Sequence, residues 1–270
     1  MKQTLLSACI LTGLCLTFSC TRNPFKTTNK AYRKEAKALA GELRAQPSAD
    51  SLQPPPYWAG TTNFGLRKPG FVIIHHTAQD ACEKTVKSFT MPVSKVSAHY
   101  VICKDGTVHH MLNDYLRAWH GGISKWGNMS DINSASIGIE IDNNGFEPFT
   151  DAQVASLLRL LAHLKRDYNI PAANFIGHAD IAPGRKVDPN RNFPWQTLAT
   201  QGFGLWYDTT GVELPRDFNA IQGLRIIGYN VKDSMAAISS FKLHFVPQDS
   251  TKPLTDDERK IIFDLEKKYQ

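Results

Sequence analysis

The sequence predicts an α/β domain followed by a small helical module, and three observations lead to this fold class. Apolar runs of strand length alternate with helical patterns between residues 57 and 203. Three short stripes of apolar residues at helical spacing follow in residues 204–270. The 270-residue chain is 42% hydrophobic and 21% charged, so it has ample material for a globular core.

Residues 1–19 have the pattern of a bacterial lipoprotein signal peptide. Lys2 precedes an apolar run over residues 5–18, and about 14 residues are too few to span a bilayer. The stretch that ends at Cys20 resembles a lipoprotein cleavage box, so we expect Cys20 to be the lipidated first residue of the mature protein. The alternative is a plain secretory signal with an incidental cysteine.

Residues 20–56 are expected to form a flexible tether between the lipid and the folded part. The segment is polar, contains few large apolar residues and ends in three consecutive prolines. A short helix is expected around residues 31–44. A tether of this length reaches at most about 110 Å at ~3.1 Å per residue, enough to span part of the gap to a nearby cell wall.

Five segments are expected to form the sheet of the α/β domain. Residues 71–74 are an uninterrupted apolar run, as in a strand that is covered on both faces. Residues 98–102 precede an Asp-Gly turn and a second short strand, which predicts a hairpin. Residues 136–141 predict another buried strand, and residues 174–177 one more.

Helix signals complete the expected fold. Thr150 is a predicted N-cap, with Gln153 in the first turn of a helix that runs to Tyr168 and is stopped by Pro171. Thr255 caps the last of three C-terminal helices in the same way. The apolar stripes of these helices are Phe218, Ile221, Leu224 and Ile227; Met235, Ile238, Phe241 and Phe245; and Ile261, Ile262 and Leu265.

Charge and cysteine content leave alternatives open. The net charge of +6 suits nucleic acid, an anionic wall polymer or a membrane surface equally, so it selects no partner. We recognise no nucleic-acid-binding motif and predict no nucleic-acid partner. Cys82 and Cys103 remain after signal cleavage, and their spacing does not decide between a disulfide and two free thiols.

Chemically active side chains follow two of the predicted strands. His178 follows the strand at 174–177, and Lys186 and Asp188 come eight and ten residues after it. Pro189 biases Asp188 toward an extended backbone, so the side chains of Lys186 and Asp188 are expected to point to one side. Strand ends are where α/β proteins build their sites, so a carboxylate and an ammonium are expected in one pocket.

Two further segments offer a second histidine and a carboxylate. His75 and His76 are adjacent, and alternation along a strand prevents both from entering one site but does not choose between them. Glu140 shares a strand face with Gly138, and a carboxylate in so apolar a strand is costly to bury without a cation, a metal site or water. Gly138 is expected to leave room for a substrate.

Two histidines and one aspartate would leave the fourth position of a tetrahedral Zn²⁺ open, which is the pattern of a catalytic site. Water in that position has its pKa lowered toward ~7. A glutamate can then take a proton, and a lysine can stabilise the oxyanion that forms at an amide carbonyl.

Five motifs together resemble those of the type 2 N-acetylmuramoyl-L-alanine amidases, which share a fold with the peptidoglycan recognition proteins. The resemblance implies a mixed central sheet flanked by helices. It also implies Zn²⁺-dependent hydrolysis of the amide bond between N-acetylmuramic acid and L-alanine in peptidoglycan or anhydro-muropeptides, for cell-wall turnover or recycling. The motifs are Ile74-His75-His76-Thr77-Ala78, Val96-Ser97-Ala98-His99-Tyr100, Ala118-Trp119-His120-Gly121-Gly122, Ile139-Glu140-Ile141, and Gly177-His178 through Asp188-Pro189.

By matching motif positions, the resemblance implies a role for each candidate. The zinc ligands would be His75, His178 and Asp188. Glu140 would be the general base and Lys186 the residue that stabilises the oxyanion.

Several further residues receive plainer interpretations. His99 and His120 are expected to line or brace the substrate cleft, and Trp119 is expected either in the core or the cleft wall or as a platform for a sugar. His76 is placed outside the ligand set, and Asp180 is expected to structure its loop.

The resemblance also implies a location and partners. The C-terminal helices are similar to the peptidoglycan-binding module of outer-membrane members. In a Gram-negative cell, the absence of an acidic residue after Cys20 favours the periplasmic face of the outer membrane in the cell envelope. We expect a monomer whose partners are peptidoglycan or muropeptides and, through its lipid, a membrane. The alternative is a non-catalytic peptidoglycan-binding protein of the same fold, but such proteins typically lose a ligand that this chain retains.

Overall fold

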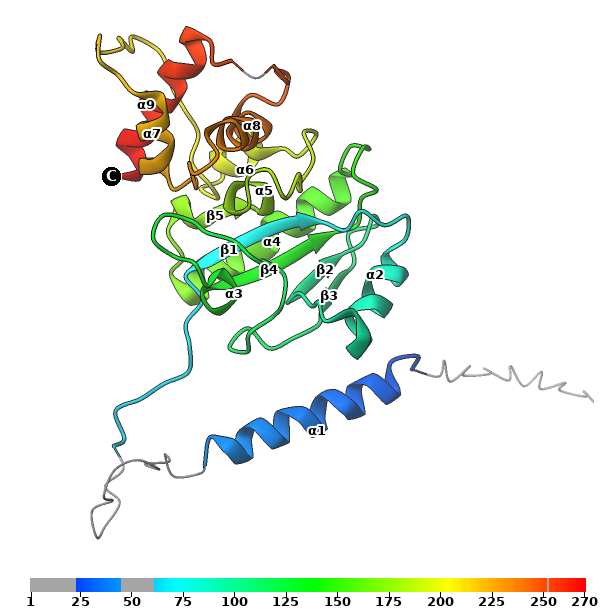
Figure 1. The fold of residues 1–270 in the computed structure, drawn as a ribbon. Helices are drawn as coiled ribbons and strands as arrows, with labels where there is room; N and C mark the ends of the chain where they lie inside the picture. Colours follow the sequence, from blue (N-terminus) through cyan, green and yellow to red (C-terminus); the bar gives the residue numbers. More distant parts are fainter. Residues whose placement is uncertain (1–22, 45–60, 252) are drawn as a thin grey trace, which may run out of the picture. The chain divides into compact units, whose positions relative to one another are not determined.

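The computed structural model describes residues 23–44, 61–251 and 253–270 (Figure 1). The predicted signal peptide, Cys20 and the proline-rich end of the tether lie outside these residues. The chain forms two compact units, one up to Thr62 and one from Asn63 to the C-terminus. In the first unit, helix α1 (Lys26–Glu42) is longer than the helix expected around residues 31–44 and has no buried residue. Among the described helices, none combines the length and the apolar character needed to cross a membrane.

The second unit contains a five-stranded sheet in the order β3-β2-β4-β1-β5 (Figure 1). All neighbouring strands are parallel except β2 and β3, which form the predicted hairpin, so the sheet is mixed as expected. The strands are β1 (Phe71–His76), β2 (Tyr100–Ile102), β3 (Val108–His110), β4 (Ser136–Ile141) and β5 (Phe175–Gly177).

The long helix follows its predicted signals. The Thr150 side chain accepts a hydrogen bond from the backbone N–H of Gln153, and the side-chain oxygen of Gln153 accepts one from the backbone N–H of Thr150. The helix ends at Tyr168, and the following Asn169 caps it in the left-handed conformation. The described helices of this unit are α2 (Cys82–Phe89), α3 (Ile132–Ala135), α4 (Asp151–Tyr168), α5 (His178–Ile181), α6 (Trp195–Thr200), α7 (Ala220–Ile227), α8 (Ser234–Phe245) and α9 (Asp256–Tyr269), with 3-10 turns at Pro92–Ser94 and Ala172–Asn174.

The two faces of the sheet are buried against different helices. Ile74 of β1 and Ile139 of β4 pack with Leu157 and the other apolar residues of α4. Ile73 of β1 belongs to a second cluster that includes Leu224 and the apolar stripes of α7, α8 and α9, except for the exposed Met235. The strand at residues 71–74 is therefore covered on both faces, as its composition predicts. Because the C-terminal helices share this cluster with the sheet, the division at residue 203 stays a prediction.

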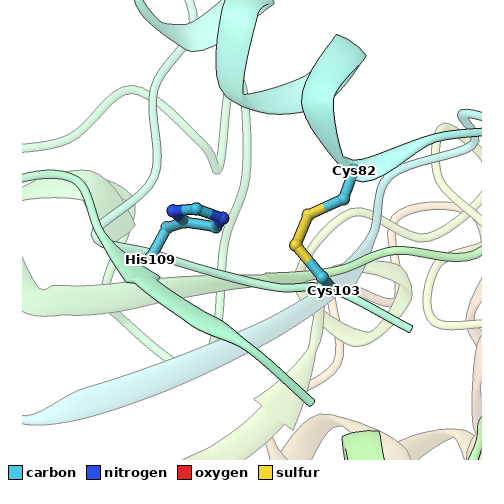
Figure 2. A group of neighbouring side chains, drawn as sticks. All are labelled: Cys82, Cys103 and His109. Carbon is cyan, nitrogen blue, oxygen red and sulfur yellow. A yellow bond between two sulfur atoms is a disulfide. The ribbon is translucent and has the colours of Figure 1, made fainter. Parts of the chain in front are cut away.

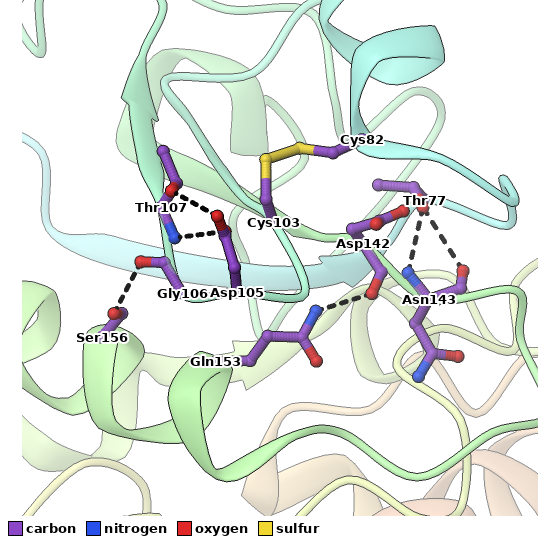
Figure 3. The surroundings of a disulfide bond; sticks show 10 residues. All are labelled: Thr77, Cys82, Cys103, Asp105, Gly106, Thr107, Asp142, Asn143, Gln153 and Ser156. Carbon is purple, nitrogen blue, oxygen red and sulfur yellow. Dashed lines mark hydrogen bonds between the residues drawn. A yellow bond between two sulfur atoms is a disulfide. The ribbon is translucent and has the colours of Figure 1, made fainter.

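Cys82 and Cys103 form a disulfide, with 5.3 Å between their Cα atoms. The bond joins the start of α2 to the end of β2, and the ring of His109 lies beside it (Figure 2). Because the two sulfurs are bonded to each other, they are not available as thiolate ligands for a metal. Hydrogen bonds between the backbone of Asn143 and the Thr77 hydroxyl fix the neighbouring turns that follow β4 and β1 (Figure 3).

Candidate metal centre

The carboxyl ends of β1 and β5 place two histidines side by side. The parallel register pairs Ile74 with Gly177, so His75 and His178 leave the two strands at the same level. His75 is still in β1, whereas His178 is the first residue of α5. The chain comes back to this point at Asp188, where the Asp188 carbonyl accepts a hydrogen bond of 2.8 Å from the backbone N–H of Ala179. Residues distant along the chain therefore converge at one edge of the sheet.

The three predicted ligands form a tight, buried triangle. The Nδ1 atoms of His75 and His178 are 2.9 Å apart, and the Asp188 Oδ2 atom is 3.1 Å and 2.9 Å from them. All three residues are less than one-tenth exposed. Ligand atoms of a tetrahedral zinc site with bonds of ~2.0–2.1 Å are separated by roughly 3.3 Å. The nitrogen and oxygen donors therefore fit one small divalent cation.

Electrostatics favours the ligand form of this group. Burial and, to a smaller extent, the neighbouring His178 lower the pKa of His75 to about 4. Burial alone would raise the pKa of Asp188, but the neighbouring rings of His178 and His75 hold it well below its usual value. At neutral pH, His75 is thus neutral and Asp188 ionised, which are the states that bind a metal.

Glu140 is the orphaned carboxylate of the site. Its Cα is paired with that of His75 in the β1–β4 register, and its Oε2 atom is buried without a hydrogen-bond partner among the described residues. Burial and, to a smaller extent, the charge of Asp188 raise the pKa of Glu140 to about 8 against the opposing charge of Lys186. Lys186 is partly buried on the same loop as Asp188, whereas the intervening Val187 is 71% exposed. The expected alternation along this loop is thus present.

The predicted cleft residues occupy different environments. His99 is fully buried, with Nδ1 accepting from the backbone N–H of Gly138 and Nε2 donating to the carbonyl of Leu116, so it has the geometry of a brace. Trp119 is half exposed, with the guanidinium of Arg117 4.3 Å above its ring.

His120 is buried against His75, and it accounts for the glycine in β4. A Cβ atom on Gly138 would come within 2.5 Å of the His120 ring. The expectation that Gly138 leaves room for a substrate is therefore wrong, because the ring already occupies this space. His76 stays outside the triangle, as alternation along β1 requires, with its ring beside Gly145.

Sequence reasoning did not single out the polar residues that hold this site from behind. Asn133, Ser136 and Arg185 form hydrogen bonds to the segment at residues 120–121. Their types are common in loops and at helix ends, and the only available signal was their position beside the recognised motifs. Asp180 structures its loop as predicted, because its carboxylate accepts a hydrogen bond from the backbone N–H of Gly177.

A mixed α/β sheet with a buried His–His–Asp triangle, an orphaned glutamate and a nearby lysine defines the class of metal-dependent hydrolases. Comparison with known proteins defines the family. Residues 65–191 match the family model of N-acetylmuramoyl-L-alanine amidase. The chain is 34% identical over 208 residues to the N-acetylmuramoyl-L-alanine amidase AmiD of Escherichia coli. The matched region covers 65% of this chain and 74% of AmiD.

Other relatives agree. The chain is 39% identical over 103 residues to the 1,6-anhydro-N-acetylmuramyl-L-alanine amidase AmpD of Haemophilus influenzae, covering 38% of this chain and 56% of AmpD. Two solved structures at 29% identity are similar along most of their length. One is E. coli AmiD in complex with anhydro-N-acetylmuramic acid-L-Ala-D-gamma-Glu-L-Lys (TM-score 0.68, 78% of this chain, 93% of that chain). The other is AmpDh3 from Pseudomonas aeruginosa (TM-score 0.69, 83% and 99%).

The chain belongs to the N-acetylmuramoyl-L-alanine amidase family. It is an amidase that hydrolyses the bond between N-acetylmuramic acid and L-alanine in muropeptides, as the motifs predict. The buried group of His75, His178 and Asp188 is its candidate metal-binding site.

Proposed function

We propose that this amidase works with one zinc ion held by His75, His178 and Asp188, with Glu140 as general base and Lys186 as the group that stabilises the oxyanion. The observation that carries the proposal is the triangle of three buried ligand atoms, all within 3.1 Å of one another. Zinc suits two imidazoles and one carboxylate, and three protein ligands leave one position open. When bound, zinc supplies a Lewis acid and lowers the pKa of water to near neutrality.

Glu140 handles the protons of the reaction. Its buried Oε2 accepts a proton from the attacking water and then delivers it to the leaving nitrogen of L-alanine as the C–N bond breaks. The pKa of about 8 in the metal-free protein keeps the carboxyl neutral, and a nearby cation favours its ionised form. The pKa then falls toward the value at which one carboxyl group serves as base and acid in turn.

Lys186 stabilises charge on the substrate. The ammonium donates a hydrogen bond to the amide carbonyl oxygen as that oxygen gains negative charge. The products are the lactyl carboxylate of muramic acid and the free amine of the stem peptide.

The substrate class follows from the relatives. E. coli AmiD was solved with an anhydromuramic tripeptide, and P. aeruginosa AmpDh3 with an anhydromuramic pentapeptide. We infer that this chain takes the same anhydro-muropeptides, and intact peptidoglycan as well. Trp119, Ile123 and Val187 are exposed on the segments that carry the site residues, and they offer apolar surface to the sugar and the peptide.

For location, we propose that Cys20 carries a lipid in the periplasmic face of the outer membrane and that residues 20–56 tether a monomeric enzyme. The C-terminal helices are proposed to hold peptidoglycan. The test is incorporation of labelled palmitate by the full chain expressed in a bacterium. Cys20→Ser should abolish labelling and release the enzyme from the membrane fraction, and equal labelling of both forms would refute the anchor.

The catalytic proposal is tested by stem-peptide release from purified peptidoglycan, quantified by mass spectrometry. We expect release by the zinc-loaded chain, loss of release with a chelator, and recovery on addition of zinc. If the zinc-loaded chain sediments with peptidoglycan but releases no peptide, the non-catalytic alternative is correct. Comparing intact peptidoglycan with purified anhydro-muropeptides in the same assay determines which substrate is preferred.

A further inference from the structure

In both His75 and His178, the ring nitrogen that faces away from the metal triangle lies within hydrogen-bonding distance of the same short segment of the chain. The Nε2 atom of His75 lies 3.0 Å from the Nδ1 atom of His120. The Nε2 atom of His178 lies 3.2 Å from the carbonyl oxygen of Gly121. Both histidines that point Nδ1 into the triangle are thus held from behind by adjacent residues, His120 and Gly121.

The direction of each hydrogen bond is fixed by the groups at its far end. The Ser136 hydroxyl donates its proton to the carbonyl of Ile132 at 2.6 Å, so its oxygen accepts from Nε2 of His120 at 3.1 Å. His120 therefore has its proton on Nε2 and a free lone pair on Nδ1. That lone pair accepts the Nε2 proton of His75, which leaves the Nδ1 lone pair of His75 directed at the triangle.

The second histidine is fixed more simply. A carbonyl oxygen only accepts, so the Gly121 carbonyl requires a proton on Nε2 of His178. The Nδ1 lone pair of His178 is then free to bind a cation. Arg185 donates to the same Gly121 carbonyl at 2.8 Å and to the carbonyl of Ile123, which ties the segment to the loop that carries Lys186.

The segment is itself rigidly seated. The side-chain oxygen of Asn133, a buried residue, accepts from the backbone N–H groups of His120 (3.1 Å) and Gly121 (2.8 Å). The His120 ring fills the space over Gly138, where a Cβ atom would approach it to 2.5 Å.

We propose that His120–Gly121 is a positioning element that sets the ring orientation and the tautomer of both metal-binding histidines. The inference rests on the metal site of the proposed function and assigns to His120 a role distinct from contact with substrate. Groups behind metal ligands commonly contribute 10–100-fold to metal affinity. Because this one segment holds both metal-binding histidines, a substitution in it should weaken metal binding although none of its residues is a ligand.

The test is the zinc dissociation constant of the full chain, measured by competition with a chromogenic chelator. His120→Phe keeps a ring of similar size and removes both hydrogen bonds, and it should weaken zinc binding by roughly 10–100-fold. His120→Asn keeps an acceptor where Nδ1 lies and should recover most of the loss. The matched control is His244→Phe, the same change at a buried, hydrogen-bonded histidine that does not touch a ligand. The control should lose stability but keep wild-type zinc affinity.

Two readouts separate positioning from a general structural role. In the Co²⁺-substituted protein, His120→Phe should alter the visible absorption bands, whereas His244→Phe should not. In zinc-loaded wild type, nitrogen-edited NMR should find a proton on Nε2 of both His75 and His178. A proton on Nδ1 of either ring, or wild-type zinc affinity in His120→Phe, would overturn the inference while the zinc site stands. If the wild type binds no zinc, the proposed function itself fails.

Discussion

Helix α5 joins two buried clusters built from the same kinds of residue, and only one of them is arranged to bind a metal. Its first residue, His178, belongs to the metal cluster with His75 and Asp188. Two residues later, Asp180 belongs to a second group with Tyr229 and His244, which we name the closed cluster.

In the closed cluster, every carboxylate oxygen has a donor. Oδ1 of Asp180 accepts from the Tyr229 hydroxyl at 2.7 Å, and Oδ2 accepts from His244 and from the backbone N–H of Gly177, also at 2.7 Å. The ring of Trp195 stacks on that of His244 with 3.9 Å between centroids. These contacts join α5 to the C-terminal helices, so the closed cluster is structural.

In the metal cluster, the ring protons of the two histidines face outward, and the lone pairs of the three ligand atoms converge. Both Nε2 atoms face acceptors, while two Nδ1 atoms and one carboxylate oxygen point at a common centre. Three acceptors cannot satisfy one another, whereas a cation satisfies all three. Histidine, aspartate and burial are thus common to both clusters, and the direction of the lone pairs distinguishes them.

The same substitution at the two aspartates should give the largest contrast. Asp188→Asn replaces a charged ligand with a weak neutral one. We expect zinc affinity and turnover to fall by more than about 100-fold, because changes behind a ligand alone cost about 10–100-fold. Asp180→Asn should keep zinc affinity within a few fold and cost roughly 1.5–3 kcal/mol of unfolding free energy, the contribution of hydrogen bonds to a charged group. Zinc content and urea unfolding measure both, and normal zinc occupancy in Asp188→Asn would move the third ligand elsewhere.

Replacing Glu140 should separate metal binding from chemistry within the metal cluster. Glu140→Gln keeps the size of the side chain but removes the proton acceptor, so turnover should fall by roughly 10²–10⁴-fold. Zinc content should stay at the wild-type level because Glu140 is not one of the three converging ligands. Turnover is followed by muropeptide cleavage, and zinc by atomic absorption. Loss of zinc together with activity would show that Glu140 is a ligand.

The pH dependence of stability offers a third contrast, in chelator-treated protein. The folded pKa of Glu140, about 8, is above its ordinary value near 4.5, so the folded state favours the neutral carboxyl. This contribution to stability is fully present below pH ~4.5 and is lost as pH rises toward 8. We therefore expect metal-free wild type to lose at least about 1 kcal/mol relative to Glu140→Gln across that window. Zinc should remove the difference, and parallel pH profiles without zinc would show that Glu140 is not buried as a neutral group.

The fold was predictable where the pattern is long or strongly apolar. The strand Ser136–Ile141 and the helix that begins after Thr150 have the expected bounds, because alternation and capping act locally. The four-residue α5 was not predicted, since one turn has no periodicity to detect. The shared core of the C-terminal helices with Ile73 also has no local signal.

The site was predictable only in part. Alternation excluded that both His75 and His76 enter one site. The choice between them requires the sheet, because only the register with β5 shows which face meets His178. A sequence separation of 103 between His75 and His178 follows no spacing rule, so the family motifs supplied the pairing. Gly138 was misjudged because the ring that fills its space comes from His120, on a distant loop.

The smallest expected effect tests whether the closed cluster influences the metal at all. Tyr229→Phe removes one hydroxyl, which donates a hydrogen bond to Asp180 at 2.7 Å. The Tyr229 ring itself is buried against Trp126. The loss should cost about 1–2 kcal/mol of unfolding free energy, because Asp180 keeps its two other donors. Zinc affinity should not change, since the Nε2 and Nδ1 atoms of His178 have no contact with Tyr229. A weakening of zinc binding as large as that expected for His120→Phe would mean that α5 transmits strain between the clusters. The direction of the lone pairs would then depend on the C-terminal helices as well as on His120–Gly121.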